Sequence, residues 1–314
     1  MSWTRGRASV TEARQAEHRE HLLSGLVAAA FTPMMNDGSL DLGRIPAVCN
    51  FVLGQGAGGL FLCGSTGESP SLTVDERMAV SEAYIEAGAG RVPTVVHVGH
   101  NSLTDARTLA AHAQKVGADA IALVPPSYFS IGSIAGLVNC LKDVADAAPD
   151  MPLYYYHIPR LTGVGLRMVD LLEQADEALP SLAGLKFSSF EFDDLLCCIR
   201  HGQRRYNVLF GSDEMLLAGL SMGAAGAVGS TFNFMGPYYR RVIDALGGGD
   251  LQQAQEHQLV ATRMVHQILK HGGHNAIKAA MAVMGEDCGP PRLPWKALSG
   301  EAVIAMREEL LDEG

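Results

Sequence analysis

One lysine interrupts an apolar segment whose composition is typical of a strand buried on both faces. The segment 183–188 has the sequence AGLKFS, with Lys186 in its middle. Burial disfavours the ammonium form of an amine, so a lysine in this setting can act as a neutral nucleophile that forms a Schiff base with a ketone. The alternatives are structural: the amine extends out of the strand end, or it sits in a buried ion pair. This segment alone leaves both interpretations open.

Polar residues that follow other apolar runs suggest partners for such a lysine. In the loop GSTGE at 64–68, backbone amides and the hydroxyls of Ser65 and Thr66 can converge on an anion without a cation, which suits a carboxylate ligand. A phenol at Tyr156 can move protons beside Lys186, because it both donates and accepts. Structural explanations also exist, since such loops are frequently simple turns and tyrosines favour strands. We expect two of the three tyrosines at 154–156 to serve packing alone.

Three further residues carry weaker signals. His97 and His100 flank a glycine at the end of an apolar run, but no carboxylate or thiol spacing completes a metal site. We therefore expect a hydrogen-bonded core histidine here and no metal. Lys278 lies in an apolar helical segment, where its amine can reach solvent, so it ranks below Lys186 as a nucleophile. The predicted chemistry therefore centres on Lys186 and uses no cofactor.

The scaffold that positions these residues is indicated by eight short apolar runs that alternate with segments of helical period. Strands that are apolar throughout and are separated by helices indicate a parallel sheet covered on both faces. Eight such units in roughly 210 residues favour a closed (β/α)₈ TIM barrel over an open doubly wound sheet, and no GxGxxG fingerprint follows the first run. The predicted strands are 26–31, 59–62, 94–98, 120–124, 153–157, 184–187, 208–210 and 227–229. The predicted helices between them are 41–53, 74–87, 103–116, 134–147, 166–178, 192–200 and 214–222.

The chain divides into three predicted parts: an N-terminal tail (1–22), the barrel (23–236) and a C-terminal helical extension (237–314). Only helices are expected in the extension, at 238–246, 251–270, 276–284 and 302–311, with glycines at 247–249 and 272–273 as stops. The tail mixes arginines with glutamates and has no apolar stretch, so neither a secretory signal nor an organelle transit peptide is expected. Chemistry in such barrels sits at the C-terminal ends of the strands. Polar residues are predicted there at 64–68, 125–128, 156–159, 186–188, 211–214 and 229–231.

The composition narrows the class of partner. The net charge is −10 and contains no basic block, so neither a nucleic-acid interface nor a membrane-surface patch is expected. No run approaches the roughly 20 apolar residues that span a bilayer. The six cysteines follow no metal or disulfide spacing, so we expect reduced thiols in a cytoplasmic enzyme. A small molecule is the expected partner.

Four motifs, in order and spacing, resemble those of the N-acetylneuraminate lyase and dihydrodipicolinate synthase superfamily, barrels in which a lysine forms a Schiff base with a pyruvoyl group. The resemblance covers about residues 26–296, and its motifs lie at 64–68, 156–159, 184–188 and 226–233. It implies that Lys186 is the Schiff-base lysine and Tyr156 the proton-transfer residue. It also implies that Ser65 and Thr66 hold the substrate carboxylate. Tyr128 would join the proton relay at a subunit interface, and the family likeness implies a homotetramer.

Within the superfamily, the motifs look most like those of the lyase branch. Where the synthase has an arginine that binds a second carboxylate, this chain has Leu161, with Arg160 one place out of register. The resemblance implies a class I aldolase that reversibly cleaves N-acetylneuraminate (sialic acid) to N-acetylmannosamine and pyruvate without metal. The implied contacts to the sugar's polyol end are Ser188, Gly211, Asp213, Glu214 and Ser230. The alternatives are the same mechanism on another 2-keto-3-deoxy sugar acid, a synthase-like condensation, and a non-enzymatic barrel that senses a 2-keto acid.

Overall fold

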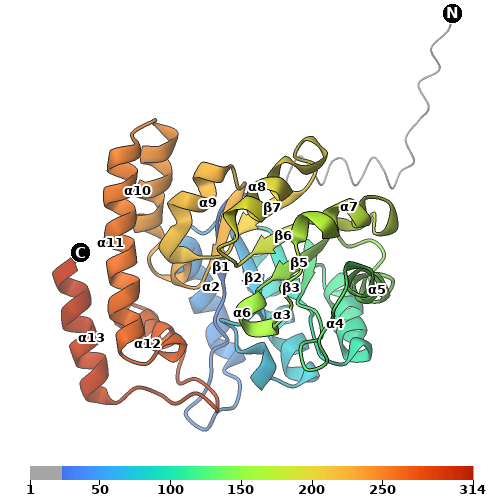
Figure 1. Ribbon diagram of the computed structural model, residues 1–314. Helices are drawn as coiled ribbons and strands as arrows, with labels where there is room; N and C mark the ends of the chain where they lie inside the picture. The colour runs from blue at the N-terminus through green and yellow to red at the C-terminus, as the bar shows by residue number, and fades with distance from the viewer. Residues whose placement is uncertain (1–22, 314) are drawn as a thin grey trace, which may run out of the picture.

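Eight parallel strands close into a barrel in the computed structural model, which describes residues 23–313 (Figure 1). Each strand pairs with its neighbours in sequence, and β1 pairs with β8. The predicted TIM barrel is therefore confirmed, and each of the eight predicted runs overlaps one of its strands. The strands are β1 (Gly25–Ala29), β2 (Gly59–Leu62), β3 (Thr94–His97), β4 (Ala120–Leu123), β5 (Leu153–His157), β6 (Leu182–Phe187), β7 (Asn207–Phe210) and β8 (Gly226–Gly229).

Helices connect the strands and cover the outside of the barrel. Several begin at residues whose side chains accept a hydrogen bond from the first turn, including Thr73, Ser102 and Ser133. The α-helices of the barrel are α2 (Ile45–Gly54), α3 (Val74–Gly88), α4 (Leu103–Lys115), α5 (Ile134–Ala145), α6 (Pro159–Thr162), α7 (Met168–Ala178), α8 (Phe192–Arg200) and α9 (Leu216–Met222). Short 3₁₀ turns are η1 (Leu42–Arg44), η2 (Ser69–Ser71), η3 (His201–Gln203), η4 (Asp213–Met215) and η5 (Thr231–Asn233).

Three helices begin later than the sequence pattern predicts, and one of them, α7, starts at Met168 instead of residue 166. The helix expected from residue 41 starts at Ile45 after η1, because Pro46 lacks an N–H and fits only the first turn. The helix expected from residue 214 starts at Leu216 after η4. There, the carbonyl oxygen of Glu214 accepts hydrogen bonds from side chains of another helix. All three corrections concern the ends of elements whose type was predicted correctly.

Successive side chains along each strand point alternately into the barrel and outward to the layer beneath the helices. On β5, Tyr154 and Tyr156 join the apolar cluster that fills the barrel, whereas Tyr155 packs in the outer core. On β6, Leu185 and Phe187 belong to the outer core, and Lys186 between them faces inward. The strand pairing places the two inward residues Tyr156 and Lys186 directly opposite each other.

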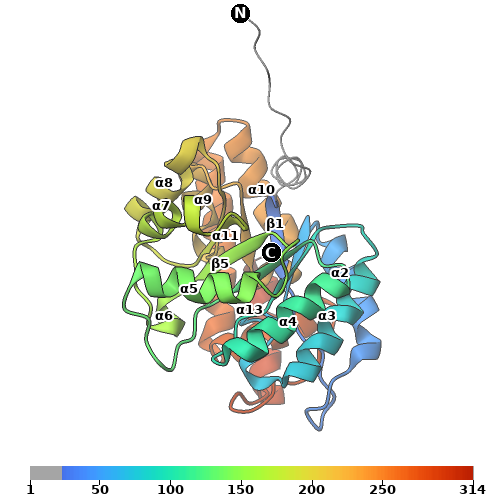
Figure 2. The same cartoon turned by 90° about the vertical axis from the view of Figure 1, so that its right-hand side faces the viewer.

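The C-terminal extension consists of α10 (Gly236–Gly247), α11 (Leu251–Lys270), α12 (His274–Met284) and α13 (Gly300–Glu313). Figure 1 shows these helices on one side of the barrel, and the turned view in Figure 2 brings α4 and α5 to the front and leaves α10 and α11 behind. The expected glycine stops are present: Gly249 has φ +81° and Gly273 φ +66°, values that favour glycine. No helix within residues 23–313 combines the length and apolar character that a bilayer crossing requires.

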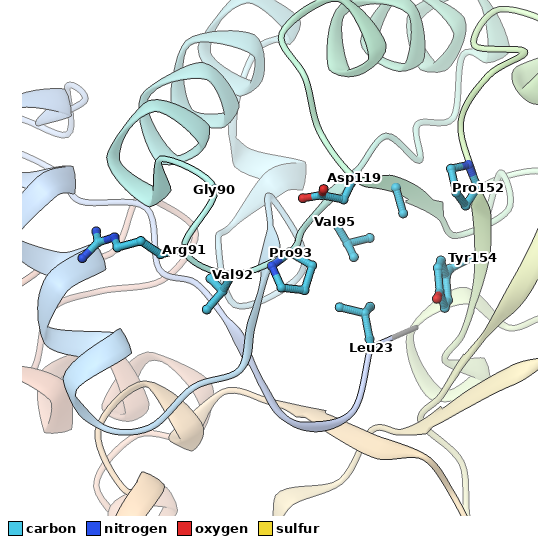
Figure 3. Close-up of a pocket in the computed structure, with 10 residues that line it drawn as sticks. Leu23, Gly90, Arg91, Val92, Pro93, Val95, Asp119, Pro152 and Tyr154 are labelled. Carbon is cyan, nitrogen blue, oxygen red and sulfur yellow. The ribbon is translucent and has the colours of Figure 1, made fainter. Parts of the chain in front are cut away.

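A cavity of about 400 Å³ opens at the end of the barrel where the strands begin (Figure 3). Leu23, Pro93, Val95 and Tyr154 are among its lining residues. Two of these precede a strand, and the phenol of Tyr154 donates to Asn207 Oδ1 at 2.9 Å at the start of β7. The polar residues singled out from the sequence lie at the opposite ends of the strands, so this cavity is separate from the candidate site.

Candidate active site

Lys186 is buried in the barrel interior, with 5% of its surface exposed. Its Nζ lies 4.0 Å from the ring centroid of Tyr156 and 4.2 Å from that of Phe61. The amine therefore does not extend out of the strand end, and that structural alternative is wrong. Two aromatic faces flank the nitrogen and would stabilise a positive charge that forms on it during a reaction. Nothing in the sequence singles out Phe61, because an aromatic residue in a strand is most simply explained by packing.

The loop after β2 is held tightly on both of its sides. The hydroxyls of Thr66 and Ser230 are 2.7 Å apart, which joins the loop after β2 to the loop after β8. The hydroxyl of Thr32 donates to the carbonyl of Gly67 at 2.7 Å, and the amide of Glu68 donates to the carbonyl of Ser65 at 3.0 Å. The structure thus brings Thr66 and Ser230 together, although they are 164 residues apart in the sequence.

Ser188 and Gly211 lie against each other at the ends of β6 and β7. A Cβ atom at residue 211 would overlap Ser188 Oγ, so any larger residue there would displace the Ser188 hydroxyl. The hydroxyl of Ser188 is buried and, among the residues that the structure describes, has no hydrogen-bond partner. Buried polar groups are nearly always hydrogen-bonded, so an unpaired hydroxyl is available to a ligand.

Asp213 is buried and already partly engaged. Its Oδ2 accepts hydrogen bonds from the amide and the hydroxyl of Thr231, at 2.7 and 2.6 Å, and that hydroxyl lies 2.7 Å from the phenol oxygen of Tyr239. Burial, with the nearby charge of Glu214, raises the pKa of Asp213 to about 6. Glu214 is partly exposed and accepts from Ser212 Oγ at 3.2 Å. Of the two neighbouring acids, Glu214 is the freer to bind a ligand.

Two side chains of α11 support the turn that carries these acids. Gln258 donates to the carbonyl of Glu214 at 3.1 Å and accepts from the amide of Leu217 at 2.9 Å. The hydroxyl of Thr262 donates to the same carbonyl at 3.0 Å. Sequence reasoning missed both residues, because a polar residue on a helix is usually explained by a solvated face.

The environment of the Lys278 amine differs from the one predicted. The sequence predicts that its amine reaches solvent, but only 3% of the residue is exposed. Its Nζ donates to Glu68 Oε1 at 2.7 Å and to the carbonyls of Thr32 and Pro290 at 2.8 and 3.1 Å. The reason is that α12 packs over a buried carboxylate, and a buried charge needs an opposite charge and full hydrogen bonding.

Three residues weighed from the sequence lie on the surface. Tyr128 is 82% exposed in the loop after β4, where its ring contacts Phe129 edge-on. Tyr156 is 4% exposed in the interior, so the proposed relay between the two tyrosines would require a second copy of the chain and stays a prediction. Leu161 is 62% exposed, and Arg160 beside it is exposed as well.

His97 is a hydrogen-bonded core residue, as expected. Its Nδ1 donates to the carbonyl of Cys63 at 3.0 Å, and its Nε2 accepts from the amide of Val124 at 3.3 Å. Burial, together with the charge of Arg77, holds the pKa of His97 well below its usual value, so the ring is neutral. His100 accepts a separate hydrogen bond, from the amide of Ser102. Within the described residues, no group of three or more His, Cys, Asp or Glu side chains could hold a metal ion.

Comparisons with known proteins agree on one family. Residues 22–311 match the model of the dihydrodipicolinate synthetase family. The N-acetylneuraminate lyases of Sus scrofa and Homo sapiens are 41% and 40% identical to this chain over 284 residues, which is 89% of this chain and 89% of each relative. The solved structure of Proteus mirabilis N-acetylneuraminate lyase superposes with a TM-score of 0.90 at 32% identity, covering 93% of this chain and 99% of that one. The sialic acid aldolase of Aliivibrio salmonicida gives a TM-score of 0.90 at 33% identity, covering 93% and 97%.

Proposed function

The chain belongs to the dihydrodipicolinate synthetase family, and on that basis we propose that it is a Schiff-base aldolase of N-acetylneuraminate. The reaction is reversible cleavage to N-acetylmannosamine and pyruvate. The relatives reported above are lyases, and this chain is an enzyme of that class. The observation that carries the proposal is the buried amine of Lys186, which faces the barrel interior beside the phenol of Tyr156.

The chemistry begins when Lys186 Nζ adds to the keto carbon of the sugar acid, and loss of water gives an iminium ion. The hydroxyl on the fourth carbon then loses its proton, and the bond between the third and fourth carbons breaks as its electrons move to the iminium nitrogen. Protonation of the resulting enamine at the third carbon and hydrolysis release pyruvate. The faces of Phe61 and Tyr156 stabilise the cation, and the Tyr156 phenol carries the protons.

The substrate carboxylate is assigned to the loop after β2. Ser65 and Thr66 present hydroxyls there, and the contact between Thr66 and Ser230 fixes one side of the loop. The polyol end is assigned to the loops after β6, β7 and β8. There the unpaired hydroxyl of Ser188 and the partly exposed carboxylate of Glu214 offer a donor and an acceptor. Gly211 leaves the room that Ser188 occupies, and Asp213 orders the turn.

The proposal also covers the oligomeric state and the cellular compartment. Tyr128 and Phe129 form an exposed aromatic pair, each 82% exposed, which suits burial against a second copy of the chain. A homotetramer is proposed from the family likeness, with Tyr128 completing the proton relay of a neighbouring subunit. All six cysteines are free, which accords with a cytoplasmic enzyme.

A panel of aldehydes tests the substrate assignment. Purified protein is expected to condense pyruvate with N-acetylmannosamine faster than with glyceraldehyde or aspartate semialdehyde, each at the same concentration. Aspartate semialdehyde should react poorly, because Leu161 is apolar and supplies no cation for its carboxylate. A higher rate with either competing aldehyde would overturn the sialate assignment and favour another 2-keto acid substrate.

The Glu214→Ala variant tests the polyol end of the pocket. It should lose about 1–3 kcal/mol of apparent transition-state binding for N-acetylneuraminate, since substrate hydroxyls are left unpaired. Pyruvate is too short to reach this end, so trapping of its imine by borohydride should be unchanged. Glu177→Ala, which removes an exposed carboxylate on α7, is the matched control. Equal loss of sugar turnover and pyruvate trapping in Glu214→Ala would contradict the assignment.

A further inference from the structure

The carboxylate-binding loop ends at a glutamate in an unusual conformation. Glu68 has φ +58° and ψ +29°, in the left-handed region that residues with a Cβ rarely adopt. Only 2% of the residue is exposed, and both carboxylate oxygens are engaged. Oε1 accepts from Lys278 Nζ at 2.7 Å, and Oε2 accepts from the amide of Arg292 at 2.7 Å. Contacts of its side chain therefore help to hold this backbone in place.

Lys278 connects this glutamate to three separate parts of the chain. Its ammonium group has three N–H donors, and the three contacts with Glu68, Thr32 and Pro290 account for all of them. Thr32 in turn donates to the carbonyl of Gly67, next to Glu68 in the loop. The lysine thus joins the loop after β2, the segment after β1 and the segment that follows α12.

Stability alone does not account for an ion pair at this place. Replacing a buried pair by apolar residues of similar size is often neutral or stabilising, because the desolvation cost of two charges disappears. Apolar contacts are not directional, whereas hydrogen bonds are, so the ion pair holds the carboxylate in one position. Glu68 is two residues from Thr66, and its amide donates to the carbonyl of Ser65, so anchoring its carboxylate restrains the loop that carries both hydroxyls.

We propose that Lys278 is a positioning residue, which holds the carboxylate-binding loop through Glu68 so that Ser65 and Thr66 meet the carboxylate of the keto acid. This inference rests on the proposed function, in which that loop binds the substrate carboxylate. Lys278 does not touch the substrate, and its effect should depend on whether the ligand carries a carboxylate. A residue that only fastens α12 to the barrel would show no such dependence.

The test compares pyruvate with pyruvamide, its neutral analogue of nearly the same shape, in borohydride trapping on Lys186. In Lys278→Met, the pyruvate concentration for half-maximal trapping should rise about tenfold, the equivalent of one lost hydrogen bond to a charged group. The value for pyruvamide should change by less than about twofold. Lys270→Met, an exposed lysine of the same extension, is the matched control and should leave both values unchanged.

A second variant keeps the test independent of folding defects. Lys278→Met alone leaves the buried Glu68 carboxylate without a counter-ion, whereas Glu68→Gln with Lys278→Met removes both charges of the pair. The double variant should melt near the wild-type temperature and still lose affinity for pyruvate selectively. Equal changes for both ligands, or no change in a folded variant, would overturn the inference. Absence of pyruvate trapping in the wild-type protein would instead overturn the proposed function.

Discussion

Replacing Lys186 with alanine is expected to abolish borohydride trapping of pyruvate and to reduce turnover by at least about 10³-fold, because the covalent intermediate is lost. No other amine is placed to substitute for it within the described part of the chain. Lys278, the other buried lysine there, has its donors occupied by Glu68 and two carbonyls. Intact-mass measurement after trapping, followed by peptide mapping, provides the readout.

The control for this variant is Lys115→Ala, which removes an exposed lysine at the end of α4. In this control, borohydride should trap pyruvate on Lys186 as in the wild-type protein. The Lys186→Ala protein should remain folded, since the truncation leaves the rings of Phe61 and Tyr156 in contact with each other. A pyruvate adduct that persists in the variant, or one that maps to Lys278 in the wild-type protein, would contradict the assignment of the nucleophile.

The Tyr156→Phe variant should fold normally and lose turnover by on the order of 10²-fold or more, the usual contribution of a general acid-base group. Its ring contacts with Phe61 and with the Lys186 amine do not need the hydroxyl, so substrate binding should change less than turnover. The measurement is kcat and KM for N-acetylneuraminate cleavage, with the melting temperature recorded for each protein.

Tyr154→Phe is the matched control, because Tyr154 lies on the same strand and also faces the barrel interior. Its phenol donates to Asn207 Oδ1 at 2.9 Å, far from the mouth of the barrel. Removing it should cost about 1 kcal/mol of folding free energy and leave turnover nearly unchanged. The two variants therefore have opposite expected effects on stability and activity. Wild-type turnover in Tyr156→Phe would remove Tyr156 from the mechanism.

The barrel could be predicted from the sequence because parallel strands are buried on both faces and so appear as continuous apolar runs. The site followed from the fold, since the C-terminal strand ends of a barrel meet at one mouth. That rule placed Thr66 and Ser230 at the same mouth, and only the structure shows that their hydroxyls are in contact. The sequence did not predict the hydrogen-bond partners that helices outside the barrel supply to the site. The environment of Lys278 depends on Glu68, 210 residues earlier, and local pattern gives no information on such a pairing.

The hydrogen bonds that hold the turn at 213–214 could not be predicted from local sequence either. Gln258 lies on a helix whose sequence predicts only that it is amphipathic, and its hydrogen bonds to the turn at 213–214 depend on how α11 docks. Phe61 was missed for another reason. An aromatic residue in a strand has the same pattern whether it packs against a leucine or covers a reactive amine.

The loop after β2 is held by Lys278 and Arg292, which lie near the C-terminus, and this order in the chain matters during protein synthesis. Ribosomes release a chain from its N-terminus, and segments that emerge early can fold early. All eight strands, with Lys186 among them, have been synthesised by Gly229, whereas Lys278 and Arg292 follow much later. A nascent chain at that stage has its nucleophile but lacks the cation that fixes the loop for keto acids. Under the proposed arrangement, the loop reaches its full affinity for keto acids only after translation is nearly complete.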